Sequence, residues 1–265
     1  MENQTIIWQQ TKVATQIFEA PEEGAKYVAA KVADFIRKRN SEGHSTVLGL
    51  ATGNTPIPLY RELIRLHQEE GLSFKNVISF NLDEYYPISP EDPNSYHSFM
   101  FRNLFSHIDI DKANVHIPVG TLAEQLIGEY CDGYERMIRE AGGIDIQILG
   151  IGRAGHIGFN EPGSQLDDIT RLVTLNPMTI KDAAGDFGGA EFVPRQALTM
   201  GVKTIMEARK VFLLGWGEKK AGILARAIEG PVGTDVPASF LKKHKDTEFI
   251  LDSGAASGLS SCKAQ

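Results

Sequence analysis

The stretch from Asp145 to Ser164 reads DIQILGIGRAGHIGFNEPGS and indicates the fold of the whole chain. It begins with a short apolar run, which is typical of a strand buried inside a sheet. Gly150, Gly152 and Gly155 follow, and glycine lets a chain turn sharply and approach a ligand closely. In an open α/β sheet, ligands bind beyond the carboxyl ends of the strands, which is where this loop would lie.

Two side chains of this loop suit proton transfer. His156 carries an imidazole that can titrate near neutral pH, and Glu161 adds a carboxylate five residues later. The same pattern also fits a glycine-rich turn with a histidine that serves only the structure. The loop by itself leaves both interpretations open.

Strand patterns alternate with helix patterns along most of the chain. We expect strands within 5–18 and at 46–50, 77–81, 114–117, 146–149, 170–175, 210–214 and 247–251. Helices are expected at 20–39, 56–70, 96–105, 122–141, 197–207 and 219–229. The glycine-containing segment 179–193 fits a mobile lid or a surface loop. This order predicts an α/β fold with a single doubly wound, mainly parallel sheet and helices on both faces, Rossmann-like.

The composition narrows the class of protein. Of 265 residues, 42% are hydrophobic and 23% charged, as in soluble globular proteins. The net charge of −7 argues against a nucleic-acid-binding surface, and no apolar run is long enough for a membrane helix. No signal peptide is evident, and the two cysteines lack metal or redox spacing, so we expect a cytoplasmic location. Residues 1–252 are predicted to form one domain and 253–265 a disordered tail.

A second loop indicates an anion site. The sequence ATGNTP at 51–56 joins an expected strand to an expected helix, and Thr55 is placed to cap that helix. Backbone N–H groups at a helix N-terminus attract anions. Lys220 lies in the first turn of another expected helix, where it opposes the helix dipole and favours an anion partner. An ordinary strand–helix connection and a solvated lysine fit these patterns as well.

Two adjacent acids follow the expected strand at 77–81. Asp83 and Glu84, within SFNLDEYY, fall at a carboxyl end of the sheet, near the loop that contains His156. A pair of solvated loop acids is the alternative interpretation.

The three stretches ATGNTP, SFNLDEYY and GIGRAGHIGFNEPGS, in this order, resemble the glucosamine-6-phosphate deaminase family, also called glucosamine-6-phosphate isomerase. SYHSFMFRNLF and ALTMGVKTIMEARKVFLL are similar as well, so the likeness covers about residues 45–251. The resemblance implies an aldose–ketose isomerisation with deamination: D-glucosamine 6-phosphate and water give D-fructose 6-phosphate and ammonia. It implies a small sugar phosphate as partner and no metal or organic cofactor. Assembly as a homo-oligomer is left open.

The resemblance also implies residue roles. Asp83 matches the general base that moves a proton between C2 and C1 of the open-chain sugar. His156 matches the group that assists ring opening, and Glu161 the acid that tunes this histidine. The substrate-binding residues implied in the same way are Gly53, Asn54, Thr55, Gly152, Gly155, Gly158 and Lys220.

Two departures from the family pattern concern the expected site. Ala154 stands where family members commonly carry an aspartate or another polar residue, and Gly185 and Asp186 stand where one branch has a phosphate-binding arginine. Two rival functions share the fold: a 6-phosphogluconolactonase-type hydrolase, against which Glu161 argues, and a sugar-phosphate sensor without turnover. The joint presence of Asp83, His156 and Glu161 favours the deaminase.

Overall fold

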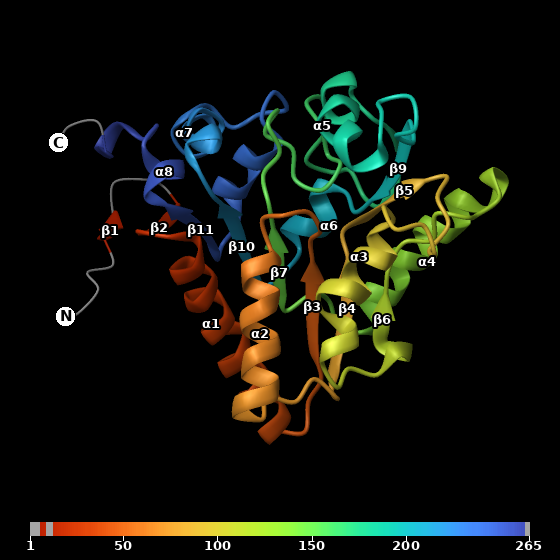
Figure 1. Cartoon of the computed structure of the whole chain (residues 1–265), viewed down its shortest axis with the longest axis horizontal. Coiled ribbons are helices and arrows are strands. Elements are labelled where there is room, and N and C mark those ends of the chain that lie inside the picture. The colour runs from red at the N-terminus through yellow and green to blue at the C-terminus, as the bar shows by residue number, and fades with distance from the viewer. Residues whose placement is uncertain (1–5, 9–12, 263–265) are drawn as a thin grey trace.

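A mainly parallel sheet runs through the centre of the molecule (Figure 1). The coordinates are a computed structural model that describes residues 6–8 and 13–262. Within these residues the sheet has eight strands in the order β1-β2-β11-β10-β7-β3-β4-β6. Their bounds are β1 Ile6–Trp8, β2 Ala14–Phe18, β3 Thr46–Leu50, β4 Val77–Asn81, β6 Val115–His116, β7 Ile146–Leu149, β10 Lys210–Gly215 and β11 Thr247–Asp252. The strand expected within 5–18 is thus present as β1 and β2, and residues 5 and 9–12 lie outside the described residues.

The order of the strands reverses between β3 and β7. From β3 the chain adds β4 and β6 on one side, whereas from β7 it adds β10 and β11 on the other. β3 and β7 are parallel neighbours, paired through Leu48 and Ile146. At such a reversal the loops that follow the two strands diverge and leave a crevice at the carboxyl edge. The loops after β3 and β7 therefore open onto one crevice.

Helices cover both faces of the sheet. The helices of the described chain are α1 Pro21–Ser41, α2 Ile57–Glu70, α3 Tyr96–Asn103, α4 Ile127–Glu140, α5 Pro177–Phe187, α6 Val202–Met206, α7 Ala221–Glu229 and α8 Ser253–Ala256. Successive residues of a strand point to opposite faces. Val211 of β10 lies in one hydrophobic core cluster together with Leu224 of α7. The next residue, Phe212, lies in a second core cluster together with Leu59 of α2. The predicted doubly wound, mainly parallel α/β fold is confirmed.

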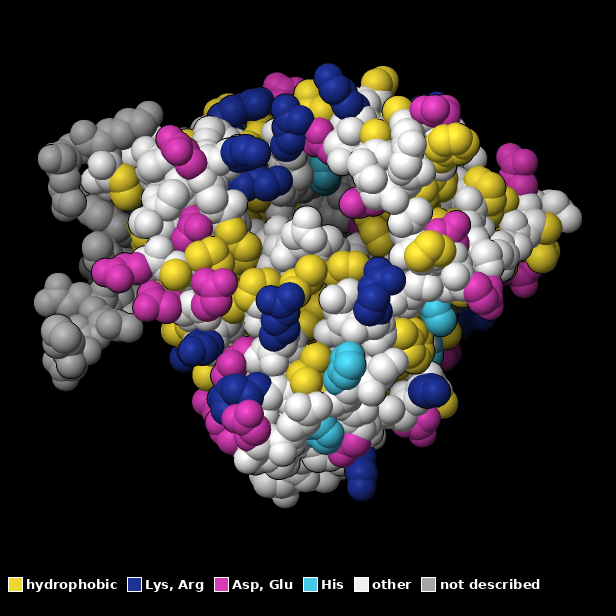
Figure 2. All heavy atoms as spheres, in the orientation of Figure 1, with side chains coloured by type: hydrophobic (Ala, Val, Ile, Leu, Met, Phe, Trp, Pro, Cys, Tyr) yellow, Lys and Arg dark blue, Asp and Glu magenta, His cyan; other side chains and the backbone are white. Residues whose placement is uncertain are grey.

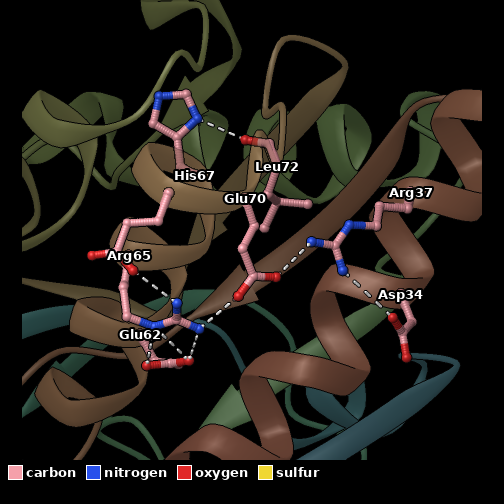
Figure 3. Close-up of polar contacts among 8 residues, drawn as sticks. Asp34, Arg37, Glu62, Arg65, His67, Glu70 and Leu72 are labelled. Atoms are coloured by element: carbon pink, nitrogen blue, oxygen red, sulfur yellow. Dashed lines mark hydrogen bonds and ion pairs between the residues drawn. The ribbon is translucent and has the colours of Figure 1, made fainter.

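An ion-pair network joins α1 to α2 at the surface (Figure 3). Arg37 of α1 contacts Asp34 and also reaches Glu70 of α2 at 3.4 Å. Arg65 contacts Glu70 at 2.9 Å and Glu62 at 2.7 Å. Because the arginines are about 40% exposed, each pair contributes only about 0.2–1 kcal/mol. Burial of the apolar faces of the two helices contributes more.

A second, smaller sheet lies at the carboxyl edge of the first. Its strands β5 Asp83–Tyr86, β9 Gln196–Thr199 and β8 Arg171–Thr174 pair antiparallel in the order β5-β9-β8. The sequence did not predict this sheet. No strand was expected at 83–86, and the helix expected at 197–207 is wrong in its first half. Residues 197–199 are all buried, so they lack the alternation that distinguishes a strand from a helix.

Two further segments differ from the prediction. The segment 179–193, expected as a lid or loop, contains most of α5, whose N-cap Asn176 accepts a hydrogen bond from the backbone N–H of Met178. Residues 253–262, expected as a disordered tail, form α8 and a short 3-10 turn. The Asp252 side chain caps α8, and Leu259 is buried. Residues 263–265 lie outside the described residues. Across the described chain, no helix has the length and apolar character needed to cross a membrane.

Candidate active site

A cavity of about 150 Å³ opens at the carboxyl ends of β3, β4 and β7. Figure 2 shows a hollow in this face with a histidine inside it and Lys and Arg side chains gathered on the side of α7. The polar and glycine residues that line the cavity are Thr52, Thr55, Asp83, Tyr96, Gly150, Gly152, His156 and Gly158. The structure therefore brings the predicted Asp83 and His156 together.

Asp83 is held at the start of β5 and is only 5% exposed. Its register partner on β9 is Thr199. Burial raises the pKa of the Asp83 carboxyl well above its usual value, and repulsion from the charge of Glu84 raises it further. A carboxylate with a raised pKa is a stronger base than one in water, which suits removal of a proton from carbon.

Glu84 points away from the cavity and joins β5 to α3. Its carboxylate accepts hydrogen bonds from the backbone N–H groups of Tyr85, Tyr96 and His97, at 2.8–2.9 Å. Burial raises the pKa of Glu84 to about 7, although these hydrogen bonds oppose the shift. The contacts hold the first turn of α3 beside β5, so that Tyr96 lines the cavity next to Asp83.

His156 is neutral at neutral pH. Burial lowers its pKa to about 4, the nearby charge of Lys220 lowers it further, and the charge of Asp182 opposes the shift. Its Nδ1 is buried and has no hydrogen-bond partner within the described part of the chain. A neutral imidazole has one nitrogen that accepts a proton and one that donates it, so it can carry a proton between two oxygens of a substrate.

Two glycines of the predicted site are needed because other groups approach them closely. A Cβ added at Gly152 would lie 1.9 Å from His156 Nε2, so the imidazole rests directly against this backbone. A Cβ at Gly158 would lie 3.2 Å from Asp83 Oδ2. Gly155 does not line the cavity; at φ +85° it packs against Val236 and serves the turn.

Glu161 contacts α5 and not His156. Its carboxylate accepts hydrogen bonds from the backbone N–H of Asn176, at 2.6 Å, and from the hydroxyl of Thr179. A second contact joins the same loop to α5, because Arg153 forms an ion pair with Asp182 at 2.7 Å. The Glu161 carboxylate lies at the N-terminal end of α5, which favours negative charge, and the role of Glu161 toward His156 stays a prediction.

The predicted phosphate loop is divided between two cavities. Thr55 lines the cavity of Asp83, together with Thr52, whereas Gly53 and Asn54 line a neighbouring cavity of about 380 Å³. The expected cap by Thr55 is wrong: Pro56 occupies the N-cap position of α2, and no side chain caps it. The Thr55 carbonyl instead accepts a hydrogen bond from Trp216, and its side chain is left to face the cavity.

Lys220 lies beside the loop that carries His156. Its Nζ donates a hydrogen bond to the carbonyl of Ile151 at 2.8 Å. It ends the 3-10 turn Glu218–Lys220 that precedes α7, close to its predicted position. Burial lowers the pKa of Lys220, and the charge of Asp182 opposes the shift.

Residues that the sequence did not indicate complete the site. Tyr96 was assigned only to a helix, yet it lines both cavities and stacks parallel to Phe159 with ring centroids 5.9 Å apart. The contact of Asp182 with the loop of His156 depends on how α5 packs, which local patterns in the sequence do not indicate. In the part of the chain that the structure describes, no group of three or more His, Cys, Asp or Glu side chains is arranged to hold a metal ion.

Residues 19–250 match the family described as glucosamine-6-phosphate isomerases/6-phosphogluconolactonase. The chain belongs to this family. Glucosamine-6-phosphate deaminase 2 of Bacillus subtilis is 48% identical over 247 residues, which cover 92% of this chain and 97% of that protein. Glucosamine-6-phosphate deaminase of Thermoanaerobacter sp. is 50% identical, over 87% of this chain and 90% of that protein.

One relative of the family is much longer. A glucosamine-6-phosphate deaminase-like protein of Bacteroides thetaiotaomicron is 47% identical over 94% of this chain, and the chain spans only 37% of its length. Among solved structures, a monomeric glucosamine-6-phosphate deaminase has a TM-score of 0.87 and 43% identity, over 92% of this chain and 99% of that one. A 6-phosphogluconolactonase from Thermotoga maritima, with a TM-score of 0.69 and 24% identity, shares the fold.

Proposed function

We propose that this chain catalyses the conversion of D-glucosamine 6-phosphate and water to D-fructose 6-phosphate and ammonia, a step of amino-sugar catabolism. Relatives named glucosamine-6-phosphate deaminase, at 48–50% identity over nearly their whole length, support this activity. The observation that carries the proposal is the meeting of a buried carboxylate, Asp83, and a neutral imidazole, His156, in one cavity.

The first step is opening of the sugar ring. The neutral His156 accepts the proton of the anomeric hydroxyl, the bond between C1 and the ring oxygen breaks, and that oxygen receives a proton. A C1 aldehyde results. The lowered pKa of His156 suits this role, since the imidazole is unprotonated and ready to act as a base at neutral pH.

The second step moves a proton between two carbons. Asp83 removes the proton on C2, and the electrons of the C–H bond form a C1–C2 double bond while the π electrons of the C1 carbonyl move to its oxygen. That oxygen takes a proton from water, which gives an enolamine. The resulting carboxylic acid returns the proton to C1, which leaves an iminium at C2. Water adds to C2, and ammonia departs as the ketone forms. Burial of Asp83 keeps solvent from competing for the proton during the transfer.

The remaining predicted residues act in positioning and binding. Glu161 acts on the reaction through α5, whose first turn it holds. Lys220 and the loop of Thr55 face the sugar phosphate, with a lysine and backbone N–H groups as the anion-binding groups. Gly152 and Gly158 leave room for His156 and Asp83.

The proposal is tested by product analysis. Purified protein incubated with glucosamine 6-phosphate should release ammonia and fructose 6-phosphate in equal amounts. The same preparation incubated with 6-phosphogluconolactone should leave its hydrolysis at the uncatalysed rate. Lactone hydrolysis without ammonia release would transfer the chain to the lactonase branch of its family, and binding without turnover would make it a sensor.

Three properties of the whole protein remain proposals. We propose that residues 1–252 act as one catalytic domain. We propose a cytoplasmic location, because the substrate is a phosphorylated metabolite and Cys131 and Cys262 are free. A homo-oligomer stays a prediction that light scattering can test; one relative of 43% identity is described as monomeric.

A further inference from the structure

An ion pair between Arg153 and Asp182 joins the loop of the site to α5. Arg153 belongs to the loop that carries His156, and Asp182 lies on α5. Their side chains meet at 2.7 Å while 63% and 35% exposed, respectively. An ion pair this exposed is weak, because water and salt screen it. Arg153 can therefore exchange the Asp182 carboxylate for another anion at a small cost in free energy.

A second cation lies within the field of the same carboxylate. Lys220 contacts the carbonyl of Ile151, two residues before Arg153 on the same loop. The charges of both Arg153 and Asp182 act on Lys220, and the charge of Asp182 also acts on His156. Two cations and one carboxylate thus converge beside the imidazole. Figure 2 shows Lys and Arg side chains gathered on this side of the hollow.

We infer that Arg153 is a phosphate-binding residue of the site and that Asp182 holds its guanidinium until the substrate phosphate replaces the carboxylate. This inference rests on the proposed function, because it takes the ligand of the site to be a sugar phosphate. A phosphate dianion is best bound by two cations, and Lys220 supplies only one. The planar guanidinium of Arg153 can bind two phosphate oxygens at once. In its ion pair with Asp182 it contacts one carboxylate oxygen, at 2.7 Å.

Substitution of the two partners of the ion pair should therefore change phosphate affinity in opposite directions. Arg153→Gln removes a phosphate ligand, so the KM for glucosamine 6-phosphate and the Kd for inorganic phosphate should both rise about 10-fold. Asp182→Asn removes a competing anion and its repulsion, so both constants should fall about 2–5-fold. If the ion pair only fastened α5, the two substitutions would weaken binding alike.

Two further variants serve as controls. The double variant Arg153→Gln/Asp182→Asn should bind phosphate more weakly than Asp182→Asn alone, because both lack the competing carboxylate and only Asp182→Asn keeps the guanidinium. Arg209 forms a matched ion pair with Asp145, also at 2.7 Å and with the arginine 60% exposed, but next to the amino end of β7. Arg209→Gln should leave the KM and the phosphate Kd unchanged.

The experiment is a calorimetric titration of inorganic phosphate into the wild type and the four variants, with steady-state assays of ammonia release alongside. Opposite shifts for Arg153→Gln and Asp182→Asn support the inference. Equal shifts in the same direction, an unchanged Kd for Arg153→Gln, or a wild type that does not bind phosphate would overturn it. Phosphate binding with the expected pattern but without ammonia release would contradict only the proposed function.

Discussion

The carboxylate of Glu161 accepts a hydrogen bond from the backbone N–H of Asn176 at 2.6 Å. Asn176 is the N-cap residue of α5, so the loop that follows β7 and carries His156 holds the first turn of this helix. The hydroxyl of Thr179 donates to the same carboxylate. The position of α5 over the site and the conformation of the loop are thereby coupled.

We expect Glu161→Ala to lower the free energy of unfolding by about 1–2 kcal/mol, since the first turn of α5 loses a carboxylate acceptor. Turnover should fall as well, because α5 is no longer held beside the site. Glu161→Gln keeps one acceptor oxygen and should recover part of the stability. Urea unfolding followed by circular dichroism measures the first effect. Unchanged stability of Glu161→Ala would show that the contact with α5 contributes nothing.

Gly152→Ala should abolish most turnover while the protein still folds. The new Cβ would lie 1.9 Å from His156 Nε2, so the imidazole must move out of its place in the cavity. A displaced general base loses about 10²–10⁴-fold in rate. The matched control is Gly222→Ala in α7, where a Cβ meets nothing within 4 Å and alanine favours the helix by about 1 kcal/mol. Comparable kcat values for the two variants would place the imidazole elsewhere.

Stability should depend on pH through His156. Its pKa is about 4 in the folded chain and about 6.5 when unfolded, so between these values the unfolded chain binds one proton more. The free energy of unfolding should therefore fall as the pH drops from 6.5 toward 4, by up to about 1.4 kcal/mol per pH unit. His156→Gln should lack this contribution. The measurement is the stability difference between wild type and variant at several pH values; a difference independent of pH would refute the lowered pKa.

Ala154→Asp should place a carboxylate close to a histidine whose buried Nδ1 has no hydrogen-bond partner among the described residues. Negative charge there would raise the pKa of His156 and hold its imidazole, so ring opening should become faster. Substrate deuterated at C2 should show a small isotope effect in the wild type and a larger one in the variant, as proton transfer on carbon becomes limiting. A large effect in the wild type that Ala154→Asp leaves unchanged would make the alanine a neutral variation.

Local patterns in the sequence predicted the parallel sheet and the cavity residues that follow its strands. Asp83 and His156 are found where the ends of β4 and β7 place them, because the carboxyl edge of such a sheet is fixed by its topology. The small antiparallel sheet was not predicted. Its strand Gln196–Thr199 is buried on both sides and too short to show a period of its own.

Contacts between distant segments could not be predicted. Glu161 was expected to act on His156, five residues away, but it contacts α5, which lies 15 residues further along the chain. Arg153 and Asp182 are likewise 29 residues apart. Neither contact follows from spacing, since both depend on how α5 packs. The cap expected from Thr55 failed for a local reason, because the helix begins one residue later, after Pro56.

The central claim is that Asp83 is the base that moves a proton on carbon during deamination, and Asp83→Asn tests it most directly. At neutral pH this variant should be at least as stable as the wild type. Because the pKa of Asp83 is raised in the folded chain, the carboxyl of the wild type lowers the free energy of unfolding as the pH rises above its unfolded-state pKa, and asparagine does not. The measurement is release of ammonia and fructose 6-phosphate from glucosamine 6-phosphate by wild type and variant. We predict equal amounts of both products from the wild type and a rate at least about 10²-fold lower from the folded variant. Turnover by Asp83→Asn at the wild-type rate would contradict the account.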